Sequence, residues 1–413
     1  MNQRTTCLIA LLLLISTSLS QSALAQASYK PEHLAKAIAL HADALVLDTH
    51  SDVTPKFHNT EWDFSARHST GHMDIPRLRD GGFNAQFLSI YMGRTEGEGR
   101  ARAEAVRRID AVYETIRRFP ELLALATSAD EITDSMKAGK IACLMGIEGG
   151  HIIESSLPAL RMFHKLGVRY MTLTHSFNVP WADSSGTMAD VKGEHDGLTE
   201  FGLKIVTEMN RIGMMVDISH VADSTFADAL KTSAAPVIAS HSSVRGVFDH
   251  RRNLSDDMLR QVKSNGGVVM INFFSSYIDP DHALKTAEWR RTHKEAIAEL
   301  KSRFGANRRA YRTELKKLQV RTSMYRTPLT VLARHVEHAA KIMGWSHVGI
   351  GADWDGVSAL PEGINHCGDL PKLTALLLAR GAKPKDLHGF LGSNLVRVMR
   401  DCEDVARKLN TPK

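Results

Sequence analysis

The stretch "LVLDTHSDV" at residues 45–53 places two potential metal ligands, His50 and Asp52, directly after an apolar run. In a β-strand, residues two positions apart point to the same side, so both side chains can face one metal ion. Ser and Asp are also common residues at the start of a helix. The stretch alone therefore leaves two interpretations open, half of a metal site and a capped helix.

Similar polar residues end other apolar runs of the chain. If these side chains are buried together, four histidines and three carboxylates require a compensating cation. Imidazoles and carboxylates without thiolates suit zinc or another divalent first-row ion. The set exceeds the four ligands of one tetrahedral zinc ion, so we expect two ions bridged by a carboxylate. The residues are His50, Asp52, Glu148, His175, His220, His241 and Asp353.

A pair of metal ions has a defined chemistry. Two ions about 3.5–4 Å apart can hold a hydroxide between them and polarise a carbonyl oxygen. Glu148 is the natural bridge, because it ends the third apolar run, between the other candidate ligands. The set therefore predicts hydrolysis of an amide or an ester.

Eight short apolar runs alternate with longer amphipathic segments. Strand-like runs that alternate with helical patterns are typical of parallel βα units, and eight such units predict an α/β fold, the (β/α)8 TIM barrel. All strands of this barrel end on one face, which carries catalysis. Gly167 and Gly213 stand where helices are expected to end, just before two of the runs. The runs are residues 44–50, 84–90, 141–148, 170–175, 214–220, 236–242, 267–274 and 347–353.

Two connections between the runs are long, residues 91–140 and 275–346. The first is expected to hold more than one helix. Within the second, residues 285–326 contain 13 Lys or Arg against four Asp or Glu. This local surplus of positive charge is larger than the net charge of the whole chain, +6. Helix formers dominate there and aromatic residues are sparse, which favours a solvated basic helical insertion at about 278–326 over a nucleic-acid site. Without a Pro-, Gly- or Ser-rich linker, residues 26–413 are expected to form a single domain.

The N-terminus has the pattern of a secretory signal peptide. Arg4 precedes the apolar run "CLIALLLLI", and "ALA" at 23–25 suits cleavage after residue 25. The run is short for a membrane span, and the polar C-terminus argues against a membrane anchor. We therefore expect an exported, soluble protein, periplasmic or secreted. Cys143 is expected to be a buried free thiol, and Cys367 with Cys402 is the one disulfide pair considered.

A dense series of motifs carries a resemblance to a known family. Together they resemble the membrane dipeptidase (renal dipeptidase) family of binuclear zinc peptidases, within the amidohydrolase superfamily. The resemblance extends from about residue 40 to 400. It implies a (β/α)8 barrel and hydrolysis of dipeptides, often with tolerance for a D-residue at the C-terminal position. The motifs are "THSDV", "MDIPRLRDGGFNAQFLSIY", "GIEGGH", "LGVRYMTLTHSFNVPWADS", "GLTEFG", "VDISHV", "VIASHSSVRGVFDHRRNLSDD" and "HVGIGADWDG".

The resemblance also implies which residues hold the metal. One zinc ion is expected on His50, Asp52 and Glu148, and a second on Glu148, His220 and His241. Two Zn²⁺ ions per subunit are thus the expected cofactors, with another divalent first-row metal as the alternative.

Further roles follow from the same resemblance. Asp353 is the expected general acid/base, which delivers a proton to the leaving amine. His175 is expected to contact the substrate carbonyl and stabilise the developing oxyanion. Arg252 is expected to bind the free carboxylate of the dipeptide, with assistance from Tyr277; only the motif favours it over the adjacent Arg251.

Five polar or aromatic neighbours of these residues are open to other interpretations. Asp355 is the alternative to Asp353, although the strand phase and the motif favour Asp353. His151 is expected to be a loop or helix-start residue, and Asp48 a structural residue on the opposite face of its strand. Trp181 and Asp183 are equally well interpreted as pocket residues and as packing residues.

The chain departs from mammalian members of the family. The anchor tail and the cysteines of their disulfides are not evident, so membrane attachment and a disulfide-linked dimer do not carry over. The basic insertion is a candidate lid or homodimer contact. A dipeptide is the expected substrate; the alternative is a binuclear amidohydrolase that acts on another small amide or lactam. A non-catalytic peptide-binding protein is disfavoured, because every expected ligand is present.

Overall fold

The computed structural model describes residues 29–59, 61–94, 97–186 and 191–411. The expected signal peptide, residues 1–25, lies outside the described residues. Within these ranges, each helix is either too short or too polar to span a membrane.

Parallel strands form a nearly closed barrel, as predicted. Along the barrel the strand order is β1-β2-β4-β5-β6-β7-β8-β9. The last strand meets the first through the hydrogen bond from Thr49 N to Ile350 O, 3.1 Å, and a parallel bridge between Ser51 and Trp354. The strands are β1 (Leu47–Asp48), β2 (Ala85–Tyr91), β3 (Leu123–Leu125), β4 (Ile141–Glu148), β5 (Val168–Thr172), β6 (Met215–Asp217), β7 (Ile238–Ala239), β8 (Val268–Ile271) and β9 (Val348–Ile350).

Strand β3 is an addition to the eight predicted strands. It lies in the connection 91–140, which holds more than one helix as expected, and pairs with β4. Its partners are Ile141–Cys143, at the start of β4, whereas β5 pairs with β4 from Met145 onward. Strand β5 therefore leaves the first half of β4 unpaired on that edge, and the three-residue strand β3 pairs with it instead.

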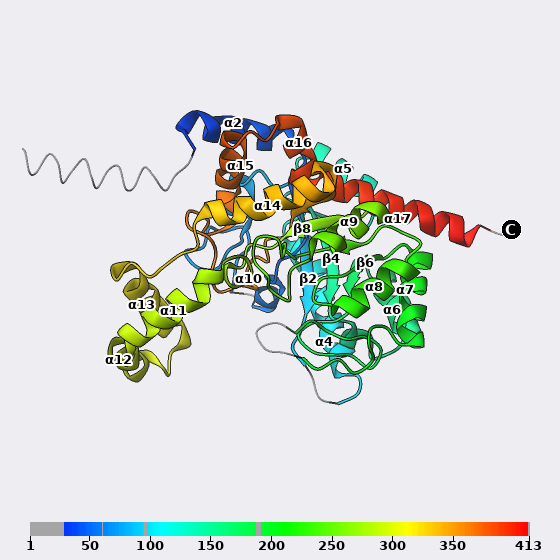
Figure 1. Ribbon diagram of the computed structural model, residues 1–413, viewed down its shortest axis with the longest axis horizontal. Helices are drawn as coiled ribbons and strands as arrows, with labels where there is room; N and C mark the ends of the chain where they lie inside the picture. The colour runs from blue at the N-terminus through cyan, green and yellow to red at the C-terminus, as the bar shows by residue number, and fades with distance from the viewer. Residues whose placement is uncertain (1–28, 60, 95–96, 187–190, 412–413) are drawn as a thin grey trace, which may run out of the picture.

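Helices cover the outside of the barrel, and the strands they cover are apolar and almost wholly buried (Figure 1). Parallel strands read as continuous apolar runs because both faces are covered. Gly213 ends α7 with φ of 80°, as its predicted role requires. The helices are α2 (Pro31–Asp43), α3 (Ile75–Asp80), α4 (Arg100–Arg118), α5 (Ala129–Lys137), α6 (Leu157–Lys165), α7 (Glu200–Ile212), α8 (Asp223–Thr232), α9 (Asp256–Asn265), α10 (Ser275–Ile278), α11 (Pro280–Thr292), α12 (Lys294–Phe304), α13 (Arg308–Arg321), α14 (Leu329–Met343), α15 (Leu370–Ala379), α16 (Pro384–His388) and α17 (Asn394–Asn410).

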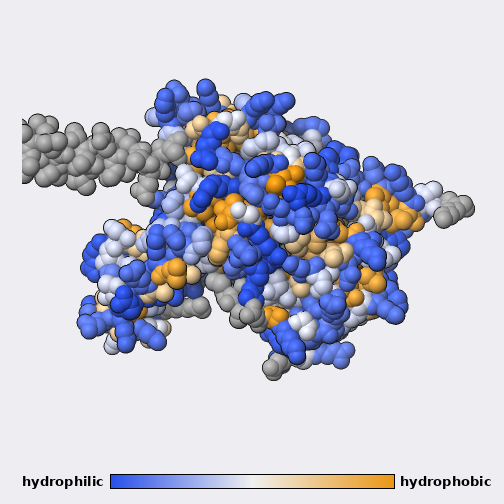
Figure 2. All heavy atoms as spheres, in the orientation of Figure 1, coloured by the Kyte–Doolittle hydropathy of each residue, from blue (hydrophilic) through white to orange (hydrophobic). Residues whose placement is uncertain are grey.

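The basic insertion is helical. Helices α11, α12 and α13 follow β8 and extend away from the barrel (Figure 1), and their surface is mostly hydrophilic, with Leu284 and Val320 as exposed apolar exceptions (Figure 2). No side chain of α12 is buried.

The cysteines at 143, 367 and 402 are all free and buried, so the pair left open by the sequence, Cys367 with Cys402, is not formed. Cys367 and Cys402 belong to two different apolar clusters of the core, and the Cys402 thiol, on α17, lies 3.3 Å from Pro236 O. Separate locations in the core thus keep the two thiols apart. Cys143 is a buried free thiol, as predicted.

We expect these thiols to resist modification in the native protein. Burial raises the pKa of Cys143 to about 12 and also raises that of Cys402, and only the thiolate is reactive. In protein that lacks residues 1–25, a chromogenic disulfide reagent should titrate the thiols slowly without denaturant and completely with it. Rapid labelling of any of the three in the folded protein would contradict this expectation.

Candidate active site

The predicted site residues meet at the carboxyl-terminal ends of the barrel strands. Glu148 is the last residue of β4, and strand pairing aligns it with Tyr91 of β2 on one side and Thr172 of β5 on the other. The other candidates follow their strands by two to four residues. Because all the strands are parallel, these ends lie on one face. The residues are His50 and Asp52 after β1, His175 after β5, His220 after β6, His241 after β7 and Asp353 after β9.

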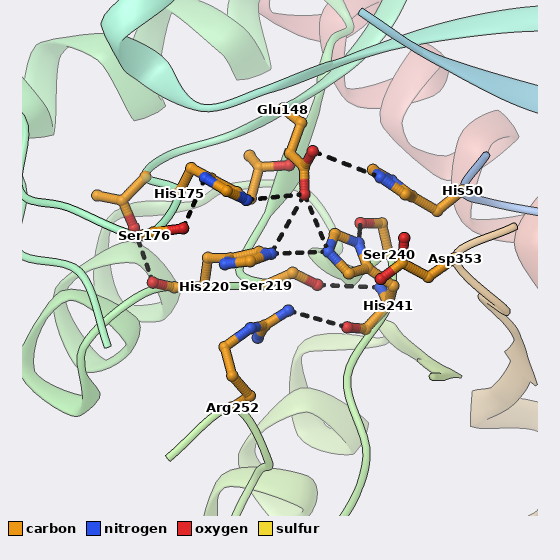
Figure 3. Close-up of polar contacts among 12 residues, drawn as sticks. His50, Glu148, His175, Ser176, Ser219, His220, Ser240, His241, Arg252 and Asp353 are labelled. Atoms are coloured by element: carbon orange, nitrogen blue, oxygen red, sulfur yellow. Dashed lines mark hydrogen bonds and ion pairs between the residues drawn. The ribbon is translucent and has the colours of Figure 1, made fainter. Parts of the chain in front are cut away.

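Four imidazoles converge on the carboxylate of Glu148 (Figure 3). Its Oε1 lies 3.2 Å from Nε2 of both His220 and His241, and 3.6 Å from Nε2 of His175. Its Oε2 lies 3.6 Å from Nε2 of His50. Glu148 thus stands at the centre of the cluster.

The structure groups the potential ligands in three overlapping sets. In each set, one potential ligand atom per residue lies within 4.8 Å of the others. Glu148 is shared by two sets and His50 by two. The sets are His50 with Glu148 and His241, Glu148 with His175 and His220, and His50 with Asp52 and Asp353.

The charges of this cluster fit a divalent cation. Burial lowers the pKa of His220 and of His241 well below the usual value, so both imidazoles are neutral, the form that binds metal. Burial alone would also lower the pKa of His50, but Glu148 and Asp52 raise it to about 10. Burial and the charge of Glu148 raise the pKa of Asp52 to about 8. The carboxylates therefore require a positive charge among them.

Two buried ligand atoms point to the same conclusion. His50 Nε2 and Asp52 Oδ1 have no hydrogen-bond partner among the described residues, although they lie only 3.9 Å apart. Buried polar atoms are nearly always paired. Shared coordination of a cation satisfies both atoms, so the residues present fit a metal centre.

The ring of His50 is held by Tyr170 of β5. The Tyr170 hydroxyl donates to Thr49 O, 3.0 Å away, and can therefore accept from His50 Nδ1, 2.9 Å away. This arrangement leaves His50 Nε2 free to face Glu148. Gly146 of β4 makes room for the Tyr170 ring, because a Cβ at position 146 would collide with that ring.

Asp353 and Asp355, the two candidates for the third carboxylate of the site, have different surroundings. Asp353 accepts a hydrogen bond from Asn272 Nδ2, 3.2 Å away, and belongs to the cluster. Asp355 is turned away and forms an ion pair of 2.8 Å with Lys56. The structure thus favours Asp353 as the carboxylate of the site, as the sequence did.

Three of the neighbours take structural positions. Asp48 accepts hydrogen bonds from the backbone N–H groups of His50 and Ala352, 2.8 Å each, and so joins β1 to the end of β9. His151 Nε2 lies 3.2 Å from Met92 O, and His151 belongs to none of the three ligand sets. Asp183 accepts from backbone N–H groups of residues 194–197 and so holds that loop.

Arg252 lies beside the cluster and is only 3% exposed. Its guanidinium donates to Ser242 Oγ, 3.3 Å, and to His241 O, 3.1 Å, and its Nε has no partner within the part of the chain that the structure describes. The guanidinium also lies 5.5 Å from the centre of the Tyr277 ring. A buried cation with only neutral partners is suited to bind an anion.

Comparison with known proteins agrees with this geometry. The family model for "Membrane dipeptidase (Peptidase family M19)" matches residues 34–413. The chain belongs to the membrane dipeptidase family. The resemblance inferred from the motifs is therefore confirmed, and this membrane dipeptidase is a metal-dependent peptidase.

Individual relatives support the assignment. Dipeptidase 3 of Mus musculus is 35% identical over 384 residues, which are 90% of this chain and 67% of the mouse protein. The probable dipeptidase PvdM from Pseudomonas aeruginosa has a TM-score of 0.78 at 23% identity, over 92% of this chain and 100% of that one. A metallo peptidase from Rhodobacter sphaeroides, liganded with a phosphinate mimic of L-Ala-D-Ala, has a TM-score of 0.70 at 24% identity, over 87% and 99%. At these identities the two structures show the shared fold.

The site of this membrane dipeptidase also contains residues that the sequence did not indicate. The ring centre of Tyr91 lies 4.7 Å from that of His175, and burial with the charges of Glu148 and Asp52 raises the pKa of Tyr91 to about 12. Tyr91 directly follows the second apolar run and ends β2, so a polar group at a strand end was the available signal. Asn272, the partner of Asp353, follows β8 in the same way.

Gly356 of the dipeptidase is expected to tolerate no side chain. A Cβ here would collide with the carboxylates of both Asp52 and Asp353. We therefore expect Gly356→Ala to displace ligand atoms and to weaken metal binding by about tenfold or more. Metal content after dialysis, measured by atomic emission, tests this.

Gly363→Ala is the control for a general effect of replacing a glycine. A Cβ at Gly363 meets no atom within 4 Å, and the φ of 86° at Gly363 makes this the more strained of the two substitutions. Normal metal content in Gly356→Ala would contradict the expectation.

Proposed function

We propose that this membrane dipeptidase binds two divalent ions, preferably zinc, and hydrolyses dipeptides that have a free C-terminal carboxylate. His50, Asp52 and Glu148 would hold one ion, and Glu148, His220 and His241 the other. The observation that carries the proposal is the convergence of four imidazoles on Glu148 at distances of 3.2–3.6 Å. A single carboxylate so surrounded suits a bridge between two ions.

When bound, the ions would polarise the peptide carbonyl and lower the pKa of a water molecule. Asp353 would move the proton. Burial raises the pKa of Asp353, and the charge of Glu148 adds to this while His50 opposes it. A carboxyl group with a raised pKa can hold a proton and then pass it to the leaving amine.

His175 would stabilise the negative charge that develops on the carbonyl oxygen. Burial lowers its pKa, which favours a neutral ring. The Ser176 hydroxyl lies 2.8 Å from Nδ1. When this hydroxyl donates to Nδ1, the hydrogen of the ring is on Nε2, the atom that faces the cluster, where it can donate to the oxygen.

Arg252 and Tyr277 would bind the C-terminal carboxylate. Arg252 is buried, lies next to the metal ligand His241 and has free hydrogen-bonding capacity at Nε. The C-terminal carboxylate lies only a few bonds from the last peptide carbonyl, so a cation in this position selects the peptide bond next to a free C-terminus. We propose acceptance of both L- and D-residues at the C-terminal position; the phosphinate mimic of L-Ala-D-Ala bound to the Rhodobacter sphaeroides protein supports this.

Arg252→Ala is expected to lower kcat/KM for dipeptides by about thirtyfold or more. Loss of one partner of a buried charge pair costs roughly 2–5 kcal/mol, and 1.4 kcal/mol corresponds to tenfold. A C-terminal dipeptide amide lacks the carboxylate, so wild type and variant should cleave it equally slowly. Arg251→Ala is the matched control and should retain the preference for the free acid. Equal loss on acid and amide would argue against this role and would favour the alternative, another small amide or lactam as substrate.

We further propose that residues 1–25 direct export, so that the mature protein acts in the periplasm or is secreted. The support is the charged start, the short apolar run and the "ALA" at 23–25. N-terminal sequencing of the protein released from the producing cells should begin at residue 26.

A further inference from the structure

A buried carboxylate behind the cluster, Asp217, has no part in the function proposed above. It ends β6 and is 0% exposed. Its Oδ1 accepts from Ser219 N, 3.0 Å, and from Ser240 N, 2.8 Å. Ser219 immediately precedes His220, and Ser240 immediately precedes His241. One carboxylate thus holds the two turns that carry two proposed ligands of the same ion.

The other oxygen of Asp217 acts on a ligand through a hydroxyl. Ser240 Oγ donates to Asp217 Oδ2, 2.6 Å away, and lies 2.8 Å from His241 Nδ1. Thr172 Oγ1 of β5 donates to the same Oδ2, 2.5 Å away. Four donors converge on this carboxylate, which in its ionised form can only accept. The Ser240 proton must therefore point to Asp217, and the Ser240 oxygen can accept from His241 Nδ1–H.

This direction determines the tautomer of His241. With its hydrogen on Nδ1, the ring presents the Nε2 lone pair to the cluster, where Nε2 lies 3.2 Å from Glu148 Oε1 and 2.9 Å from His220 Nε2. Figure 3 shows Ser240 beside the His241 ring, on the side away from Glu148. His50 has only the neutral Tyr170 hydroxyl in the corresponding place, and His220 Nδ1 has no partner among the described residues. A charged support behind the ring is therefore specific to His241 among the three.

We propose that Asp217 is a positioning residue that, through Ser240, sets the tautomer and orientation of His241, and so sets the affinity of the His220–His241 half of the site for its divalent ion. The proposal rests on the proposed function, in which His241 is a metal ligand. Partners of this kind typically contribute about 10- to 100-fold to metal affinity.

The decisive variant is Asp217→Asn. An amide NH2 in place of Oδ2 donates to Ser240 Oγ, which then donates to His241 Nδ1 and moves the ring hydrogen to Nε2, the wrong tautomer for binding. Ser240→Ala removes the hydroxyl that connects Asp217 to His241, without reversing the direction of the hydrogen bonds. Thr172→Val is the matched control, because it also removes one hydrogen bond to Asp217 Oδ2 from a fully buried position but leaves the Ser240–His241 contact.

The experiment is a competition titration of zinc against a chromophoric chelator, with apo-protein melting temperature and the ¹⁵N shifts of the His241 ring as independent readouts. We expect Asp217→Asn to weaken one of the two equivalents of zinc by about tenfold or more and to shift the ring hydrogen to Nε2. We expect Ser240→Ala to weaken the same equivalent and Thr172→Val to change it little.

Three results would decide against the proposal. Wild-type affinity for both equivalents in Asp217→Asn would overturn it, as would equal losses of affinity and melting temperature in Asp217→Asn and Thr172→Val, which would indicate a structural role. If Asp217→Asn does not fold, an unchanged titration in Ser240→Ala overturns it. His241→Ala separates this from failure of the proposed function: if that variant still binds both ions, the ligand set itself is wrong.

Discussion

Asp353→Asn is expected to lower kcat for a dipeptide by about 10²- to 10⁴-fold, the usual contribution of general acid/base catalysis, and to leave the metal content unchanged. Asparagine keeps the size of the side chain and an oxygen that can accept the hydrogen bond of 3.2 Å from Asn272. It has no proton of suitable pKa to deliver to the leaving amine. Loss of turnover without loss of metal would therefore identify a proton-transfer residue.

The measurement combines steady-state hydrolysis with metal analysis of the same preparation. Asp355→Asn is the matched control, two residues further along the chain. Asp355 is paired with Lys56, 2.8 Å away, outside the three ligand sets, so its loss should lower stability and leave most of the activity. If Asp353→Asn loses metal together with activity, Asp353 is a ligand and not the acid/base.

Glu148→Gln is expected to have the larger effect, because both halves of the proposed site share this carboxylate. A neutral amide offers one oxygen where two ions need two, and it removes the negative charge on which four imidazoles converge. We expect metal affinity to fall by more than about 100-fold, beyond the range observed for residues that only support a ligand. Activity should disappear with the metal.

Glu154→Gln provides the comparison in the loop that follows β4. Glu154 accepts from Gly99 N, 2.8 Å, at the start of α4 and pairs with Arg102, 2.7 Å away. Its replacement should affect stability and leave two ions bound. A Glu148→Gln protein that retained both ions after dialysis would show that Glu148 does not bridge them.

The barrel and the centre of the site could be predicted from the sequence for a specific physical reason. Parallel strands buried on both faces are read as apolar runs, and their carboxyl ends share one face. Glu148 and His241, 93 residues apart, could therefore be placed together before any contact was known. Strand β3 was not predicted. It has three residues and pairs with only the first half of β4, which is too short for a recognisable sequence pattern.

Features that depend on side-chain contacts between strands could not be predicted. Nothing local in "VDISH" shows that Asp217 reaches Ser240 and Thr172 on neighbouring strands. The same holds for Gly146, which is small because the Tyr170 ring crosses it from the next strand. The sequence likewise left open whether Cys367 and Cys402 pair, because their places in different parts of the core depend on tertiary contacts.

The central claim, a dipeptidase that depends on two metal ions, is tested most directly by zinc titration of metal-stripped protein with dipeptide hydrolysis as the readout. L-Xaa-L-Xaa and L-Xaa-D-Xaa substrates should both be inert to the stripped protein, and activity should rise with zinc to a plateau at two ions per chain. Full activity without metal, or a plateau at one ion, would contradict the account.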